Sequence, residues 1–312
     1  MIRTESLVKR FGDKTAVDDL TITVEPGHVT GFLGPNGAGK STTMRLIMGL
    51  EHPTSGCASV NGRPILGHSA PLTEVGALLE AKAFHSQRSA RAHLQALAAS
   101  HHLPSRRADE VLEFAGLAAV ADKPAGTFSL GMGQRLGIAS ALIGDPATVI
   151  LDEPINGLDP EGVLWVRDTV RGLAAEGRTV FLSSHLMSEM AQTADRLIVI
   201  GEGHLLADKP IADVLAWASK PKTRVRSPEA KLIAEEFTLP EAHIEWQSPD
   251  ILVIAGIESA RIGEAAARNG WILHELVPIS ATLEEAFFDL TEESVEYRSS
   301  ASSTNDPVRQ LV

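Results

Sequence analysis

One stretch of the sequence decides the fold: Gly34-Pro35-Asn36-Gly37-Ala38-Gly39-Lys40-Ser41-Thr42. It matches the pattern G-x-x-x-x-G-K-[ST], follows the apolar run Val29–Leu33 and precedes the helical pattern Thr43–Leu50, which is the context this pattern requires. Glycines let backbone N–H groups close around an anion, and the start of a helix adds partial positive charge. We therefore predict a loop whose nine residues bind phosphates, with Lys40 at the β- and γ-phosphates and the Ser41 hydroxyl on Mg²⁺.

Two acids follow a second apolar run and are predicted to complete the phosphate site. Val149-Ile150-Leu151 forms a strand pattern that ends in Asp152 and Glu153. Such a pair alone is more often a helix N-cap, but here Pro154 follows at once and a phosphate loop is present. At the end of a strand beside that loop, Asp152 would support Mg²⁺ and Glu153 would polarise an attacking water.

The first two hundred residues alternate short apolar runs with glycine turns and helical patterns. This alternation is typical of an α/β fold with a mostly parallel sheet covered on its faces. Between about Ser86 and Gly144 the chain is rich in Ala, Leu, Arg and His without a strand pattern, which predicts an inserted α-helical subdomain. The predicted strands are Leu20–Val24, Val29–Leu33, Val75–Leu79, Thr148–Leu151, Thr179–Leu182 and Arg196–Ile200.

A different pattern begins after about Lys220 and predicts a small C-terminal α+β domain over residues 220–293. Its elements follow the order βαββαβ, typical of a split βαβ fold, and a further helix is predicted at Leu283–Leu290. Residues 1–218 would form the first domain, and the polar tail 294–312 is predicted to be disordered. The elements of the small domain are the strands Lys222–Arg226, His243–Trp246, Ile251–Ala255 and Trp271–Leu276 and the helices Glu229–Phe237 and Ser259–Asn269.

The composition excludes several classes of protein. The 312 residues include 28 Lys and Arg against 40 Asp and Glu, a net charge of −12, which argues against a nucleic-acid partner because phosphate neutralisation needs clustered Lys and Arg. No run approaches the roughly 18 apolar residues of a membrane-spanning helix, and Met1–Arg10 lacks the apolar stretch of a signal peptide. With Cys57 as its only cysteine, the chain forms no internal disulfide. These features predict a cytosolic chain.

Phosphate loops occur in GTPases, kinases, helicases and transport ATPases, so a further stretch has to discriminate between these classes. Phe128-Ser129-Leu130-Gly131-Met132 stands just before the Asp152 strand, at the end of the helical insertion. It resembles the Leu-Ser-Gly-Gly-Gln signature of the ATP-binding-cassette (ABC) family, at the family's expected place. The resemblance extends over about residues 1–215 and implies a P-loop, RecA-like ABC ATPase core that uses ATP and Mg²⁺.

Three more positions match the family's motifs in the expected order. His185, in Leu182-Ser183-Ser184-His185, resembles the switch histidine, and the stretch Asn156-Gly157-Leu158-Asp159-Pro160 resembles the D-loop. Phe11 stands where the family has an aromatic residue that stacks on adenine. Taken alone, Phe11 could equally be a core residue and His185 a satisfied interior histidine.

In the family, the signature motif of one subunit binds the γ-phosphate held by the other. The resemblance assigns that contact to Ser129, Leu130, Gly131 and Met132, together with Asp159 of the D-loop. A serine before a helix is ordinarily a plain N-cap, and the two roles are compatible because a helix N-terminus is also an anion site. The same resemblance assigns catalysis to Lys40, Glu153 and His185.

The sequence departs from the family pattern at two places. Glu80 stands where the family usually has a glutamine that joins Mg²⁺ to the transporter interface. A carboxylate ligates Mg²⁺ as an amide oxygen does, but it adds a charge near the phosphates. Leu130 and Met132 replace a signature Gly and Gln. Together with Leu283-Glu284-Glu285-Ala286-Phe287 near the C-terminus, these features resemble the branch of bacitracin- and daunorubicin-type antibiotic and peptide export ATPases.

The resemblance therefore predicts the ATP-hydrolysing subunit of a membrane exporter. Two cassettes, as a homo- or heterodimer, would close on ATP and drive a separate permease, which places the chain in the cytoplasm on the inner face of the cell membrane. An importer subunit shares this chemistry and is the first alternative. A soluble ABC ATPase that acts on ribosomes or DNA is the second, but such members carry two cassettes, long coiled coils or zinc sites.

Overall fold

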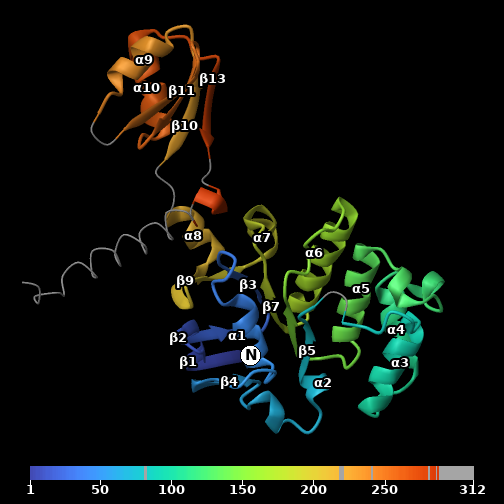
Figure 1. Cartoon of the computed structure of the whole chain (residues 1–312). Coiled ribbons are helices and arrows are strands. Elements are labelled where there is room, and N and C mark those ends of the chain that lie inside the picture. The colour runs from blue at the N-terminus through green and yellow to red at the C-terminus, as the bar shows by residue number, and fades with distance from the viewer. Residues whose placement is uncertain (81–82, 218–220, 240–241, 280–281, 286, 288–312) are drawn as a thin grey trace, which may run out of the picture. The chain divides into compact units, whose positions relative to one another are not determined.

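The structure is a computed structural model that describes residues 1–312 except 81–82, 218–220, 240–241, 280–281, 286 and 288–312 (Figure 1). The chain divides into two compact units, Met1–Ile211 and Ala212–Val312. The boundary predicted at residues 218–220 and the predicted disordered tail both lie outside the described residues.

A six-stranded sheet forms the centre of the first unit (Figure 1). Its strand order is β5-β6-β7-β3-β8-β9; neighbours from β5 to β8 pair in parallel, and β9 pairs antiparallel with β8. The predicted mostly parallel sheet is therefore confirmed. Strands β3, β6 and β7 are buried along their whole length, which explains why their sequences are nearly continuous apolar runs. The strands are β3 (Val29–Leu33), β5 (Val75–Leu78), β6 (Thr148–Leu151), β7 (Thr179–Ser183), β8 (Arg196–Gly201) and β9 (His204–Pro210).

A second, antiparallel sheet of the first unit has the order β2-β1-β4. It consists of β1 (Ile2–Phe11), β2 (Lys14–Val24) and β4 (Ser55–Val60), of which the sequence analysis predicts only the end of β2. In β1 the pairing register with β2 shifts between Thr4 and Leu7, where Ser6 has a φ of 44°. This bulge interrupts the two-residue period by which a strand is recognised in sequence.

Apolar side chains from both sheets and from α1 (Lys40–Ile47) share one core. Phe32 of β3 and Phe181 of β7 pack with their ring centroids 5.0 Å apart, and Met44 of α1 is fully buried in the same cluster. The helix predicted over Thr43–Leu50 begins three residues earlier because Gly39 already acts as its N-cap. The core holds α1 in place and leaves its N-terminus at the phosphate loop.

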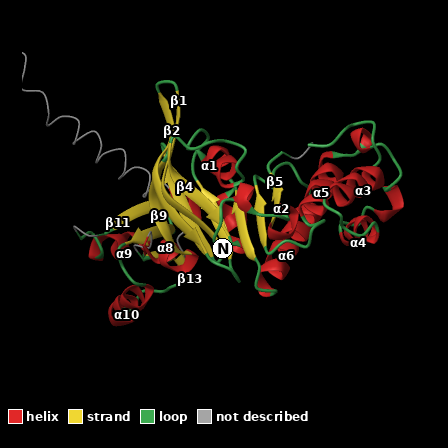
Figure 2. Ribbon diagram, turned by 90° about the horizontal axis from the view of Figure 1, so that it is seen from below, coloured by secondary structure: helices red, strands yellow, loops and turns green. Residues whose placement is uncertain are grey.

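Residues 86–144 form helices without a strand, as predicted. Figure 2 shows α3, α4 and α5 on the side of the first unit away from β1 and β2. The last helix of the insertion packs directly on the central sheet: a Cβ atom at Gly76 of β5 would lie 1.8 Å from the carbonyl oxygen of Ala141. The elements are α3 (Ala90–Ser100), α4 (Arg106–Phe114), η2 (Ala118–Val120), η3 (Ala125–Thr127) and α5 (Leu130–Ala141).

Outside the insertion, the helices described between α1 and β10 are short, apart from α6. Among the described residues, no helix combines the length and the apolar character that crossing a bilayer would require. These elements are η1 (Ile65–Gly67), α2 (Pro71–Glu74), α6 (Pro160–Ala175), α7 (Met187–Thr193) and α8 (Ile211–Trp217).

The second unit contains a four-stranded antiparallel sheet of order β11-β12-β10-β13 with two helices, and its βαββαβ order confirms the predicted α+β fold. Val225, Leu252 and Ile254 of the sheet pack with Ile233 of α9 and Ile262 of α10 in one core. Of the predicted helix Leu283–Leu290, residues 283–285 and 287 are helical and the others lie outside the described residues. The elements are β10 (Lys222–Arg226), α9 (Ala230–Glu236), β11 (His243–Ser248), β12 (Ile251–Ala255), α10 (Ser259–Asn269) and β13 (Glu275–Ile279).

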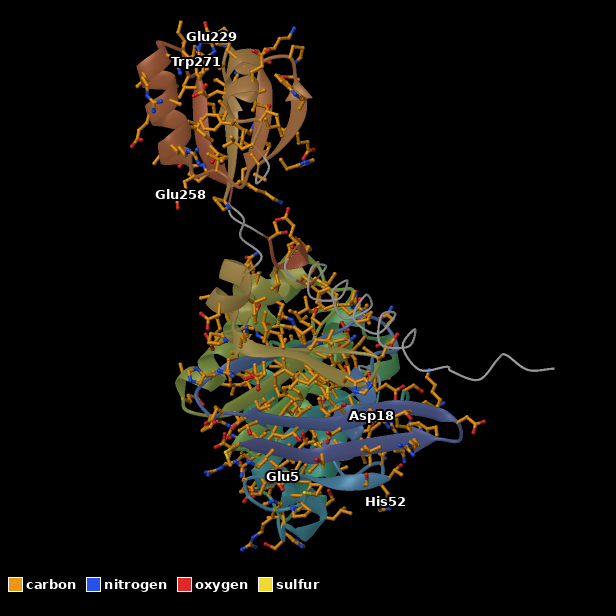
Figure 3. All side chains as sticks on the ribbon, turned by 90° about the vertical axis from the view of Figure 1, so that its left-hand side faces the viewer. Glu5, Asp18, His52, Glu229, Glu258 and Trp271 are labelled. Carbon is orange, nitrogen blue, oxygen red and sulfur yellow. The ribbon has the colours of Figure 1, made fainter. Side chains whose placement is uncertain are left out.

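The last strand of this unit starts at Glu275 rather than at Trp271, so its predicted start is wrong by four residues. Gly270, with a φ of 73°, ends α10, and the Trp271 N–H then donates to the carbonyl of Ala266. The Ile272 N–H donates to Oε2 of Glu229 (3.2 Å), which lies beside Trp271 at one end of the unit (Figure 3). These two N–H groups bond to the end of α10 and to Glu229. The pairing of β13 with β10 therefore begins only at Glu275.

The close approach of Gly76 in β5 to the carbonyl oxygen of Ala141 in α5 leads to a prediction about stability. Gly76→Ala is expected to lower the free energy of unfolding by about 3 kcal/mol, because the added methyl group meets backbone rather than a movable side chain. Gly172→Ala is the matched control, since a Cβ at this exposed position in α6 meets nothing within 4 Å; it should raise stability by about 0.5–1 kcal/mol. Thermal unfolding followed by circular dichroism measures both, and equal effects of the two variants would contradict the packing described here.

Candidate functional site

The glycine-rich loop joins the end of β3 to the start of α1 and requires glycine at two positions. Gly37 has a φ of 83° and Gly39 a φ of 106°, a region that residues with a side chain rarely adopt. A Cβ atom at Gly39 would also lie 2.3 Å from the carbonyl oxygen of Ala16 in β2. The loop therefore lies against the backbone of β2, with the N-terminus of α1 behind it.

The turn between β8 and β9 ties this loop to β2. The N–H of Gly203 donates to the carbonyl of Ala38 (3.0 Å), and the carbonyl of Gly203 accepts from the N–H of Asp18 (2.9 Å). Nε2 of His204 also lies 3.4 Å from Oδ2 of Asp18, whose place on β2 is labelled in Figure 3. One turn thus holds both the phosphate loop and the strand in front of it.

Lys40 lies at the first position of α1 and is only 7% exposed. Its Nζ donates to the carbonyl of Gly34 (2.6 Å) and to that of Pro35 (3.3 Å). Burial lowers the pKa of this ammonium group, while the carboxylates of Glu153 and Asp152 act in the opposite direction. Little solvent screens the charge of this buried cation, so it attracts an incoming anion more strongly than an exposed lysine would, while the two acids oppose that attraction.

A cavity of about 390 Å³ opens in front of the loop. Phe11, at the end of β1, forms one wall with its ring 48% exposed, and Nζ of Lys9 lies 4.7 Å from the ring centroid. An exposed ring at this place is available for stacking and does not belong to the core. The cavity is lined by Phe11, Lys14, Ala16, Asn36, Gly37, Gly39, Lys40, Ser41, Thr42 and Glu153.

The two predicted acids follow β6 directly and are held by a histidine and a serine from the end of β7. Nδ1 of His185 lies 2.7 Å from Oε2 of Glu153. The hydroxyl of Ser183 donates to Oδ1 of Asp152 and accepts from the backbone N–H of Glu153 (2.9 Å). The structure therefore brings together the histidine and both acids predicted from the sequence.

Ser183 is a site residue that the sequence analysis does not single out. It is fully buried and contacts both acids, although it occurs in the stretch quoted for His185. A serine at the end of an apolar strand carries no distinctive signal. Its importance comes only from the pairing of Leu151 with Leu182, which sets the ends of β6 and β7 side by side.

Glu80 lies in a second depression, of about 330 Å³, on the other side of the acids. It follows β5 by two residues, and the N–H of Asp152 donates to the carbonyl of Leu78 (2.7 Å), so the two strand ends are adjacent. Glu153 lines both depressions and joins them. The second depression is lined by Leu79, Glu80, Leu130, Asp152, Glu153 and Asn156.

The predicted signature residues stand at the N-terminus of α5, apart from the phosphate loop. Ser129 is the N-cap, accepting from the N–H of Met132 (3.2 Å), and Leu130 is 43% exposed. Asp159 likewise caps α6 and accepts from the N–H of Gly162 (2.8 Å). None of the residues described along the phosphate cavity comes from the signature stretch or is Asp159.

The first unit has the features of a P-loop nucleoside triphosphatase: the loop after β3, the acids after β6 and the helical insertion. A family profile described as "ABC transporter" matches residues 17–156, and one described as "Domain of unknown function (DUF8746)" matches residues 221–284. The bacitracin transport ATP-binding protein BcrA of Bacillus licheniformis is 43% identical over 213 residues, 67% of this chain and 70% of its own length. The Nod factor export ATP-binding protein I of Burkholderia lata is 32% identical over 292 residues, 91% of this chain and 94% of its own.

A solved structure of an ATP-binding subunit of an ABC transporter has the same fold. It superposes with a TM-score of 0.64 at 25% identity, over 70% of this chain and 92% of its own. The chain belongs to the family of ABC transporter ATP-binding proteins, which hydrolyse ATP.

The hydrogen bonds of Ser183 with Asp152 and Glu153 predict that this serine supports ATP hydrolysis. Ser183→Ala should lower the rate of ATP hydrolysis about tenfold or more, because it leaves the Glu153 N–H without its acceptor and frees the Asp152 carboxylate. Ser184→Ala is the matched control: Ser184 is equally buried, but its hydroxyl accepts from the N–H of Leu186 and contacts neither acid. Steady-state ATPase rates compare the two variants, and an unchanged rate in Ser183→Ala would contradict this arrangement.

Proposed function

We propose that this chain hydrolyses ATP to drive the export of an antibiotic, peptide or similar compound across the cell membrane. The observation that carries the proposal is a single cavity in which Lys40, Ser41 and Glu153 face an exposed aromatic ring, Phe11. A nucleotide would lie in it with the base at the ring and the phosphates at the loop. The transport and export names of its relatives support the exporter assignment.

The side chains around the phosphate cavity fit a Mg²⁺ ion. Ser41, Asp152 and Glu80 offer only oxygen donors, which this ion prefers. The described residues contain no group of three or more His, Cys, Asp or Glu side chains placed to hold a metal, and Mg²⁺ is commonly held by one or two carboxylates plus substrate phosphates. When bound with ATP, the ion would neutralise charge on the phosphates. Ser41 and Asp152 would hold it, and Glu80 would approach it from the side of β5.

Glu153 is proposed to take the proton of the attacking water. Its carboxylate lines the phosphate cavity and hydrogen-bonds with Nδ1 of His185, which would orient it. Lys40 would compensate charge that develops on the phosphoryl group. The nine loop residues, from Gly34 to Thr42, would hold the phosphates through backbone N–H groups and the start of α1.

A second nucleotide-binding subunit would complete each site. The exposed N-terminus of α5, with Ser129, Leu130, Gly131 and Met132, is an anion-binding helix end that one chain does not direct into its own phosphate cavity. We infer that it contacts the γ-phosphate bound by the other subunit, with Asp159 nearby. The paired subunits would act on a separate permease, on the cytoplasmic side of the membrane. ATP binding would favour the closed pair and hydrolysis the open one.

The role of Glu153 has a direct test. Glu153→Gln should bind Mg-ATP but hydrolyse it at least about a hundredfold more slowly, because an amide cannot accept the proton of water. ATP should then convert the variant into a stable dimer, measured by size-exclusion chromatography with Mg-ATP. Lys40→Ala is the control that should lose hydrolysis without unfolding and without forming the dimer. A Glu153→Gln chain that stays monomeric and still turns over ATP would exclude Glu153 as the base.

Glu80 is proposed both to contact the metal side and to transmit the state of the nucleotide to the permease. Glu80→Gln keeps an oxygen ligand and should retain basal ATPase activity within about tenfold. Glu80→Ala removes the ligand and should lose permease-stimulated activity before basal activity. ATPase rates with and without the permease measure both effects. If Glu80→Ala leaves both rates unchanged, Glu80 has neither role.

A further inference from the structure

The backbone of Glu153 is held in a conformation that is unfavourable for a residue with a side chain. Its φ is 50°, in the left-handed region, and Pro154 follows it. Such backbone strain persists only where the surroundings fix it. The direction of the Glu153 carboxylate therefore depends on the groups that hold the backbone of this residue.

Two of the groups that hold Glu153 lie beside the acids, at the end of β7 and just after Pro154, and one lies in the helical insertion. Ser183 accepts from its N–H, and the N–H of Asn156 donates to its carbonyl (3.2 Å). The same carbonyl accepts from Nε2 of Gln134 (3.2 Å), which belongs to α5 in the helical insertion. Of these contacts, only the one from Gln134 connects Glu153 to a different part of the first unit.

The side chain of Gln134 links helix α5 to the backbone of Glu153. It lies five residues after Ser129, about 7.5 Å along the helix axis from the exposed N-terminus. Its side chain is only 2% exposed, so the amide has little room to turn. A shift of α5 would therefore move the donor of the hydrogen bond to the Glu153 carbonyl.

Stability does not explain a glutamine at this position. Oε1 of Gln134 is buried, and no residue in the described part of the chain donates to it. A buried acceptor without a donor destabilises a fold, whereas an apolar side chain of similar volume does not. If the amide were removed, the Glu153 carbonyl would keep its bond from Asn156.

We propose that Gln134 is a positioning residue that couples the signature helix α5 to the catalytic carboxylate of Glu153. This inference rests on the proposed role of Glu153 as the base. When a second subunit's nucleotide contacts the N-terminus of α5, the helix and the amide of Gln134 move together. The backbone of Glu153 shifts with its carbonyl. The carboxylate of Glu153, with its hydrogen bond to His185, then moves into or out of the geometry that hydrolysis requires.

The test replaces the amide without changing the volume of the side chain. Gln134→Met in the full chain should lower kcat for Mg-ATP about tenfold, with KM for ATP within about twofold of the wild type. Its thermal midpoint should stay equal or rise, because the unpartnered acceptor is gone. Gln134→Leu is a second variant that removes the donor without adding a buried polar group, and it should lose kcat to a similar extent.

Ser140→Ala is the matched control within α5. Within the described part of the chain, the hydroxyl of Ser140 donates to the carbonyl of Leu136 in the same helix and to no other group, so its loss should leave kcat within about twofold. Wild-type kcat in Gln134→Met and Gln134→Leu would overturn the proposal, and so would a kcat loss that Ser140→Ala shares or that accompanies an equal loss of stability.

The proposed function and this inference fail in different ways. A wild-type chain without ATPase activity, or a Glu153→Gln chain that is fully active, would overturn both. An inactive Glu153→Gln chain beside a fully active Gln134→Met chain would overturn the coupling alone.

Discussion

The parallel pairing of β6 with β7 is the constraint on which the rest of the site depends. Leu151 lies opposite Leu182, so the next residues, Asp152 after β6 and Ser183 at the end of β7, lie side by side. One buried hydroxyl then contacts the carboxylate of Asp152 and the backbone of Glu153. The sheet itself therefore places the two acids next to each other, before Gln134 and His185 act on Glu153.

The site contains more carboxylates than cations. Two cations, Lys14 and Lys40, line the phosphate cavity, and the pKa of Lys40 is influenced by Glu153 and Asp152. Glu80 adds a third carboxylate at the neighbouring depression. Acids in excess would repel a triphosphate, and this is the imbalance that the proposed Mg²⁺ would correct.

Sequence reasoning is most successful here where the signal is local. The phosphate loop, the acids after β6 and the central strands are each defined by residues that are neighbours in the chain, and the structure contains them all. The strands β1 and β4 and the start of β13 are predicted poorly because bulges and helix-end hydrogen bonds interrupt their patterns.

Ser183 and Gln134 illustrate a different limit of prediction from sequence. Both are ordinary polar residues, one at a strand end and one inside a helix. Their contacts with Glu153 join positions 30 and 19 residues apart. No local pattern contains such pairings, since they follow from the register of the sheet and the packing of α5.

The close approach of Gly39 to Ala16, with Gly203 bonded to both the loop and β2, has a consequence for how the site tolerates change. The phosphate loop and β2 lie backbone against backbone, and β2 pairs in turn with β1, the strand that ends in Phe11. A disturbance of the turn at Gly203 would therefore reach both walls of the cavity, the loop and the aromatic side, at once.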